Sequence, residues 1–259
     1  MGKRAFDIGV SSHMGNRKKI NEDSVLIKVG EHCGNEFGLF AVADGMGGLD
    51  AGEEAGRIAV EGLNSWWNER LYGLIRDGCV LKPSNISCEL ERVFEKINLD
   101  IKKYSDREAL KMGTTLTVIF IYEDRYFVKH IGDSRLYMLN SGIKKVTMDH
   151  SWVAREVQSG HLTEEEAKEH PRRNVLFQCL GVHEQLHTFT EENEIKANDA
   201  FLICSDGFHV YLSDKEMLSS YQDTVENKFS SQYYVDLTVR RVLSKEALDN
   251  ISCILIRKY

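Results

Sequence analysis

The sequence lacks the long apolar runs that cross membranes or direct secretion. No stretch of its 259 residues approaches 18 apolar residues in a row, which is about the length of a membrane-spanning helix. The first ten residues are too few and too polar for the apolar part of a secretory signal. Phe6 stands where N-myristoylation of Gly2 would need serine or threonine. We therefore expect no membrane association and a cytoplasmic location.

Paired cysteines and a basic excess are also missing. The six cysteines include no C-x-x-C pair, and Cys204 and Cys253 lie inside apolar runs, which is typical of buried residues in the reducing cytoplasm. The net charge is −7, which argues against nucleic acid as a partner because phosphate backbones require basic surfaces. Walker A, G-x-S-x-G and zinc-finger patterns are absent as well.

What is present is an ordinary globular composition, with 42% apolar and 28% charged residues. No stretch resembles a linker, and the sequence contains no internal repeat. We therefore predict one domain covering residues 1–259, although the length also permits two small domains.

Short runs rich in β-branched and aromatic residues predict strands, and turn residues such as Asn140-Ser141-Gly142 and Glu123-Asp124 join neighbouring runs as hairpins. The predicted strands are Phe6–Ser12, Ser24–Val29, Phe37–Ala43, Thr114–Tyr122, Arg125–Ile131, Arg135–Leu139, Ala200–Cys204 and Ile251–Arg257. Many strands joined by short turns favour antiparallel pairing.

The predicted helices are grouped, which favours an α+β fold over a doubly wound parallel sheet. They cover Ala51–Leu74, with Asp50 as N-cap and Glu53 as its capping-box partner, Ser84–Tyr104 after Pro83, a segment opened by Ser213-x-x-Glu216, and Tyr233–Ser244. The charged segment Ser151–Pro171, with a capping box at Thr163-x-x-Glu166, is predicted to form a small inserted subdomain.

Acidic residues stand where the apolar strands begin or end. They are Glu22, Asp23, Asp44, Asp133, Asp206 and Asp249. One such residue is typical of a turn, but convergent strand ends would gather several carboxylates, and their repulsion requires cations. Carboxylate, carbonyl and water ligands select Mg²⁺ or Mn²⁺. Two such metals can activate one water, so the pattern indicates phosphoester chemistry.

In their order, the motifs resemble those of the metal-dependent type 2C serine/threonine protein phosphatases (the PPM family), particularly the compact bacterial members. The matching segments are Asn21-Glu22-Asp23-Ser24, Asp44-Gly45-Met46-Gly47-Gly48, Gly52-Glu53, Gly113-Thr114-Thr115, Gly132-Asp133-Ser134-Arg135, Asp149-His150-Ser151, LTEEEAKEHPRRNVL, Cys204-Ser205-Asp206-Gly207 and Asp249-Asn250. Any one of these motifs is weak, but the ordered set is specific and covers nearly the whole chain.

The resemblance implies a central antiparallel β-sandwich with a pair of helices on each outer face, in four α-β-β-α layers, and a flap at about residues 151–180. It implies two Mn²⁺ or Mg²⁺ ions and a third in bacterial members. By position, Asp44 would bridge two metals, Asp206 and Asp249 would complete one site, and Glu22 with the Gly45 carbonyl would complete the other. Asp23 would hold a metal-bound water, and Asp133 would bind the third metal with Asp206.

The implied reaction is direct attack of a metal-activated water on phosphoserine or phosphothreonine, without a phospho-enzyme. The implied partners are phosphorylated proteins and an opposing serine/threonine kinase, and we expect a monomer. Two positions depart from the family. Lys18 stands where an arginine usually grips the phosphate, so either Lys18 or Arg17 would do so here. Met46 replaces a histidine of animal members, and the general acid is open.

Two other functions compete with this interpretation. A non-catalytic module that has lost its metals is disfavoured by the intact acidic set. A two-metal phosphoesterase acting on nucleic acid is disfavoured by the acidic net charge and the flap, whereas small phosphoesters stay open as surrogate substrates. Away from the acids, we expect Trp66 and Trp67 to pack in and beside the core, Gly113-Thr114-Thr115 to serve close backbone packing, and His150 and Ser151 to hold the flap base.

Overall fold

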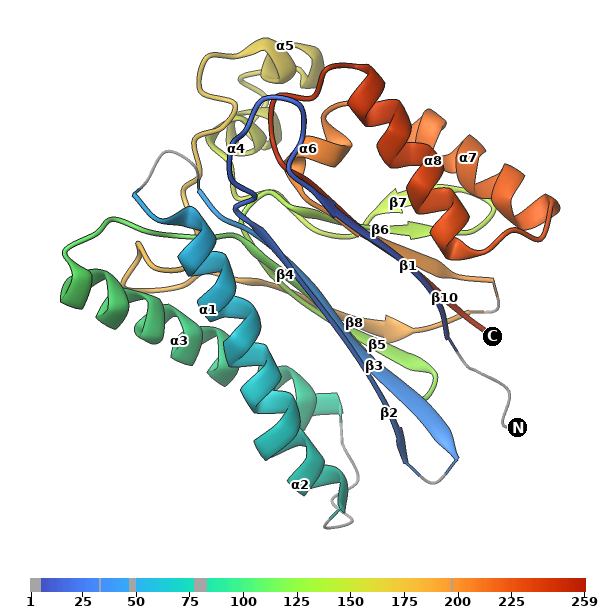
Figure 1. Ribbon diagram of the computed structural model, residues 1–259, viewed down its shortest axis with the longest axis horizontal. Helices are drawn as coiled ribbons and strands as arrows, with labels where there is room; N and C mark the ends of the chain where they lie inside the picture. Colours follow the sequence, from blue (N-terminus) through green and yellow to red (C-terminus); the bar gives the residue numbers. More distant parts are fainter. Residues whose placement is uncertain (1–5, 33, 47–49, 77–82, 197) are drawn as a thin grey trace.

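The computed structural model describes residues 6–32, 34–46, 50–76, 83–196 and 198–259. In it, two antiparallel sheets lie face to face between outer helices (Figure 1). The first sheet has the order β1 (Phe6–His13), β10 (Ile251–Lys258), β9 (Ala200–Cys204), β6 (Arg135–Leu139) and β7 (Ile143–Lys145). The second has the order β2 (Asp23–His32), β3 (Asn35–Asp44), β4 (Leu116–Tyr122), β5 (Arg125–Ile131) and β8 (Phe189–Glu194).

Alternation along the strands supplies an apolar face to each side of both sheets. On β3, Phe40 and Val42 point between the sheets, where they join Ile203 of β9 and Ile254 of β10 in one buried cluster. Leu39 on the same strand points the other way, into a cluster shared with the helices. The central strands are therefore buried on both faces, and helices must cover the outside.

The second sheet is covered by α1 (Gly52–Ser65) and α3 (Pro83–Glu108), with the π-helical turn η1 (Trp66–Leu71) and α2 (Tyr72–Arg76) continuing α1. Trp66 is buried in this cluster and Trp67 packs at its rim, as predicted. The first sheet is covered by α7 (Asp214–Glu226) and α8 (Ser231–Ser244) (Figure 1). The four-layer α+β architecture is thus confirmed.

The inserted segment forms α4 (Trp152–Gln158) and α5 (Glu164–Glu169), at the same end of the sandwich as the short helix α6 (Asp206–His209) (Figure 1). Two of the three predicted capping boxes are confirmed, at Thr163 with Glu166 and at Ser213 with Glu216. In the described part of the chain, no helix has the length and apolarity needed to cross a membrane.

The predicted cap of the first long helix is wrong. Ala51 is the N-cap residue of α1, and no side chain caps it. Asp50 instead pairs with Lys111, whose backbone N–H donates to the Asp50 carboxylate at 2.9 Å. The Asp50 side chain therefore accepts a hydrogen bond from a residue distant in sequence instead of capping the helix that follows it.

Other differences concern helix and strand extents. The first predicted helix, Ala51–Leu74, is interrupted by the π-helical turn η1, and the second continues to Glu108. Strands β7 and β8 were not predicted; β7 has only three residues, and β8 (FTEENE) is polar because it forms an edge.

Antiparallel pairing gathers the acidic strand ends at one end of the sandwich. In the second sheet, Asp23 at the start of β2 lies opposite Asp44 at the end of β3. In the first, Cys204 at the end of β9 lies opposite both Arg135 of β6 and Cys253 of β10. The short connection from β5 to β6 passes from one sheet to the other through Asp133. The acids predicted to converge therefore come from both sheets.

The assignment of Ser213 as the N-cap residue of α7 can be tested by mutation. Ser213→Ala removes the hydroxyl that accepts from the Glu216 N–H, so we expect a loss of about 1 kcal/mol in the free energy of unfolding. Urea unfolding would measure it, with Lys215→Ala on the same exposed turn as the control. Equal stability of the two variants would contradict the assigned cap.

Candidate active site

Asp44 is the centre of the acidic group. Loss of hydration on burial raises its pKa well above the usual range, and the charges of Asp23, Asp206, Asp133 and Asp249 raise it further. Each of those carboxylates is therefore close enough to repel Asp44. The structure brings together the acids that the sequence singled out at the strand ends.

The pKa values of the neighbouring acids are raised as well. Burial raises the pKa of Asp206 to about 6, and the charge of Asp249 adds to the rise although a hydrogen bond with Asp44 opposes it. Burial likewise raises the pKa of Asp23 to about 7, against hydrogen bonds from Ser252 and Ser205. The pKa of Asp133 is raised by burial first and by Asp206 second. A cation among these oxygens would relieve all four.

Lys18 is the positive group at the edge of this cluster. Its Nζ lies 2.9 Å from a Glu22 oxygen and 3.0 Å from an Asp249 oxygen, so it joins the acids from opposite sheets. Arg17 points elsewhere: its guanidinium lies 3.6 Å from Glu246, with 66% of its side chain exposed. Of the two candidates for the phosphate grip, the structure places only Lys18 beside the acids.

Asn250 fixes the backbone around Glu22. Its side-chain oxygen accepts from the Glu22 N–H at 2.9 Å, and its amide donates to the carbonyls of Met14 and Ile20. These hydrogen bonds therefore hold the loop that carries Lys18 against the start of β10. Asn250 stands in the last of the matching motifs, which by itself predicts no role for this residue.

Close backbone contacts make glycine necessary at two positions of the centre. A Cβ on Gly45 would lie 2.3 Å from the Gly52 carbonyl oxygen and 2.7 Å from that of Glu22. A Cβ on Gly52 would lie 2.6 Å from Glu22 Oε1. A side chain at Gly52 would push the Glu22 carboxylate away from the cluster, and one at Gly45 would collide with the backbone. Gly47 and Gly48, which complete the predicted motif, lie outside the described residues.

The Gly113-Thr114-Thr115 segment holds Asp44 from the other side. The Thr115 hydroxyl accepts from the Asp44 N–H at 3.0 Å, and the Thr114 hydroxyl donates to the Asp44 carbonyl at 2.9 Å. Gly113 packs against Met46, whose Cε would lie 2.2 Å from an added Cβ. The expected close backbone packing is confirmed, and these hydroxyls fix the end of β3.

Asp133 is supported by a second group of polar residues, His209, Arg135 and Asp149. Arg135 and Asp149 belong to the matching motifs without an assigned role, and His209 lies outside them. His209 Nε2 lies 3.0 Å from the Asp133 carbonyl, and burial lowers the pKa of His209 to about 3, so the ring is neutral and can donate through this nitrogen. Next to Asp133 in sequence, Arg135 donates three hydrogen bonds to Asp149. Burial alone would raise the pKa of Asp149, but the Arg135 guanidinium lowers it to about 2.

The flap joins the centre through His150 and Ser151, as expected. The His150 ring accepts from the Gly132 N–H, and the His150 N–H donates to the Gly132 carbonyl. Ser151 caps α4 and pairs with Leu176 across the base of the flap. His150 therefore fixes the flap to the turn that carries Asp133, and Ser151 joins the two ends of the flap base.

The donor set fits hard divalent cations. The converging side chains offer carboxylate oxygens, and Asp23 Oδ1 is buried without a hydrogen-bond partner, so one acceptor is still available for a metal-bound water. Within the described ranges, no three His, Cys, Asp or Glu side chains already form a closed metal-binding group. The carboxylates would therefore have to rotate around an ion, whose charge would offset their repulsion.

Comparison with known proteins finds similar sequences. A model of the family described as protein phosphatase 2C matches residues 11–249. The serine/threonine phosphatase Stp of Listeria monocytogenes is 30% identical over 85% of this chain and 84% of its own length. PstP of Mycobacterium tuberculosis is 35% identical over 78% of this chain and 36% of its own length.

Solved structures agree as well. Stp1 of Staphylococcus aureus superposes with a TM-score of 0.86 and 26% identity, over 100% of this chain and 97% of the other. The PstP catalytic domain in complex with two manganese ions superposes with a TM-score of 0.79 and 27% identity, over 97% of each chain.

The chain belongs to the protein phosphatase 2C family. This confirms the resemblance drawn from the ordered motifs. It also confirms the predicted enzyme class, a metal-dependent serine/threonine protein phosphatase.

We predict that the ion pair between Arg135 and Asp149 stabilises the folded protein. Asp149→Ala leaves the Arg135 guanidinium mostly buried and unpaired, which should cost roughly 3–5 kcal/mol of unfolding free energy near pH 7. The folded pKa of about 2 lies below an unfolded value of about 3.9. The stabilisation is therefore present above pH of about 4 and is lost as the pH falls toward 2.

Urea unfolding at a series of pH values would measure both effects, with Asp106→Ala, an exposed carboxylate on α3, as the control. The gap between wild type and Asp149→Ala should narrow below pH of about 4. A gap that stays constant with pH would show that the charge of Asp149 is not what stabilises this end of the sandwich.

Proposed function

We propose that this chain removes phosphate from phosphoserine and phosphothreonine of proteins at a two-metal centre. Asp44 would be a ligand of both divalent cations, Asp206 and Asp249 would complete one site, and Glu22 with the Gly45 carbonyl would complete the other. Asp23 would orient a water. The observation that carries this assignment is the mutual repulsion of four half-buried or buried carboxylates around Asp44, which bound cations would convert into attraction.

When bound, the cations supply Lewis-acid chemistry, acidifying a water and offsetting charge on the phosphoryl group. The chain's own residues orient the substrate. Lys18 carries a positive charge to the mouth of the cluster, where it can hold a phosphate oxygen as a point charge rather than as a bidentate fork. Asp23, held by the Ser205 hydroxyl at 3.0 Å, keeps its second oxygen available for a water.

Direct attack by water, without a phospho-enzyme, is supported by the thiols beside the acids. Burial raises the pKa of Cys179 to about 12, and the charge of Asp133 acts in the same direction. Burial also raises the pKa of Cys204. Both thiols are therefore protonated near neutral pH and are poor nucleophiles.

We extend the proposal to finer features of the enzyme. A third cation would bind between Asp133 and Asp206, whose charges repel each other. Either Mn²⁺ or Mg²⁺ suits the oxygen donors. We propose a monomer, because the acidic cluster is complete within a single copy of the chain. We also propose a cytoplasmic enzyme, because the four described cysteines, Cys88, Cys179, Cys204 and Cys253, are free thiols. An opposing serine/threonine kinase is proposed because it would supply the phosphorylated residues that such a phosphatase acts on.

Hydrolysis of a phosphothreonine peptide with Mn²⁺ tests the metal centre. We expect turnover that EDTA abolishes and Mn²⁺ restores. Asp44→Ala and Asp206→Ala should each lower kcat by at least about a hundredfold, because each removes a ligand, while the exposed control Asp106→Ala keeps the wild-type rate. Turnover that resists chelation, or near-normal rates in either ligand variant, would refute the assignment.

The phosphate grip has its own test. Lys18→Ala should raise the KM for the phosphopeptide by about tenfold or more, because it removes the charge at the mouth of the cluster. Arg17→Ala should change it less than about twofold, since Arg17 faces Glu246. Circular dichroism checks that both variants fold. The reverse order of effects would transfer the role to Arg17.

A further inference from the structure

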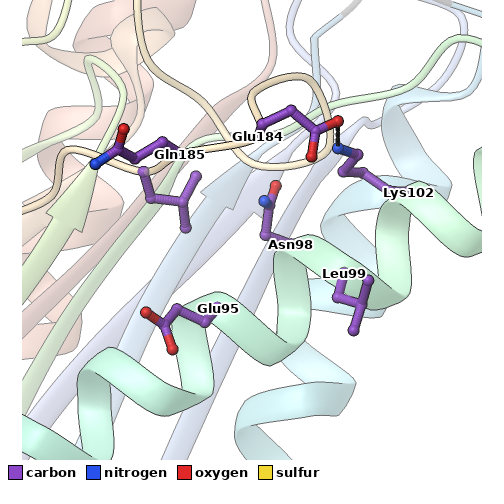
Figure 2. A pocket seen from close by; sticks show the side chains of 7 residues that line it. Glu95, Asn98, Leu99, Lys102, Glu184 and Gln185 are labelled. Carbon is purple, nitrogen blue, oxygen red and sulfur yellow. Dashed lines mark hydrogen bonds and ion pairs between the residues drawn. The ribbon is translucent and has the colours of Figure 1, made fainter.

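A groove of about 430 Å³ lies on the outer side of α3, where the loop that leaves the flap crosses the helix (Figure 2). Glu95, Asn98, Leu99 and Lys102 line it from α3, and Glu184, Gln185 and Leu186 line it from the loop. Most of these side chains are exposed, but Asn98 is only 6% exposed. A buried amide in an exposed groove requires partners inside the protein.

Both ends of the Asn98 amide bind the loop. The side-chain oxygen accepts from the Gly181 N–H at 2.7 Å, and the side-chain nitrogen donates to the His183 carbonyl at 3.0 Å. Figure 2 shows Asn98 pointing from α3 toward this loop. One side chain therefore fixes residues 181–183, which leave the flap, to a long helix.

The clamped segment leads directly to the acidic centre. Leu180, next to Gly181, exchanges two backbone hydrogen bonds with Thr114, at 3.1 and 2.9 Å. The Thr114 hydroxyl donates to the Asp44 carbonyl. A short run of hydrogen bonds therefore links the Asn98 amide on the helix to the backbone carbonyl of Asp44, the residue at the centre of the cluster.

Packing at Gly181 makes this arrangement rigid. Gly181 has a φ of +88°, and an added Cβ would lie 2.5 Å from Ile101 Cγ2 on α3 and 2.8 Å from the Met112 carbonyl. The segment is thus held between α3 and the residues that precede Thr114. Small displacements at Gly181 would be passed on to Thr114.

The ion pair between Lys102 and Glu184 cannot hold the loop against α3 as Asn98 does. It also connects α3 to the loop (Figure 2), but the Glu184 side chain is 91% exposed, and such surface pairs contribute little. Asn98 is therefore the residue that defines this connection in the described part of the groove.

We propose that Asn98 is a positioning residue for the phosphatase reaction, which holds the flap exit and, through Leu180 and Thr114, the backbone of Asp44. The inference rests on the proposed role of Asp44 as the metal bridge. It adds that metal affinity depends on a side chain on the outer helix layer, which would not contact metal or substrate.

Two variants test the proposal in the full-length chain. Asn98→Ala removes both hydrogen bonds, and Asn98→Asp keeps an acceptor for Gly181 but loses the donor to His183. Leu99→Ala is the matched control, because Leu99 lines the same groove and is 49% exposed. Mn²⁺ binding by calorimetry, Mn²⁺ activation of phosphopeptide hydrolysis and amide hydrogen exchange of residues 180–183 are measured for each variant.

For Asn98→Ala we expect about a fivefold higher half-saturating Mn²⁺ concentration, somewhat less than the loss typical of direct supports of a metal ligand. Exchange at residues 180–183 should accelerate even without metal. Asn98→Asp should show a smaller shift, and Leu99→Ala none. If Asn98→Ala does not fold, Asn98→Asp decides the question by the same measurements.

A lower melting temperature with unchanged Mn²⁺ binding would overturn the proposal, because Asn98 would then only stabilise the fold. Exchange at residues 180–183 equal to wild type would overturn it as well. Wild-type protein without Mn²⁺ binding or activation would instead contradict the proposed function. In that case the metal-free exchange rates still decide whether Asn98 holds the flap exit.

Discussion

The repulsion among carboxylates at one end of the sandwich is the constraint on which the rest of the site depends. Asp23, Asp44, Asp133 and Asp206 all have raised pKa values because burial and their neighbours both oppose ionisation. A protein keeps such a group only if other interactions hold it together. Asn250 holds the backbone at Glu22, and Thr114 and Thr115 hold the backbone at Asp44, so the chain at these two acids is fixed independently of their carboxylates.

The acids come from both sheets, and the connections explain how they meet. Asp23 and Asp44 lie at paired ends of β2 and β3, whereas Asp206 and Asp249 flank β9 and β10 of the other sheet. Lys18 already joins the two sides by contacting Glu22 and Asp249. A cation bound among these oxygens would also fasten one sheet to the other, so we expect the sandwich and the catalytic centre to support each other.

Local patterns predicted much of this structure. Alternating strands, the capping boxes at Thr163 and Ser213, and the acidic strand ends could all be read from neighbouring residues. The features that local patterns missed or mispredicted depend on long-range contacts. Asp50 pairs with Lys111 instead of capping its helix, and Asn98 binds a loop more than eighty residues away. The choice between Lys18 and Arg17 depended on side-chain direction, which sequence spacing does not encode.

The pairing of β1 with β10 has a consequence for how the protein is made. Residues 6–13 pair along their length with residues 251–258, and Asp249 lies two residues before this strand. While the chain is still emerging from the ribosome, β1 has no partner and Asp249 has not been synthesised. The first sheet and the acidic cluster can therefore be completed only after residue 258 has been translated, so this end of the sandwich is among the last parts of the fold to form.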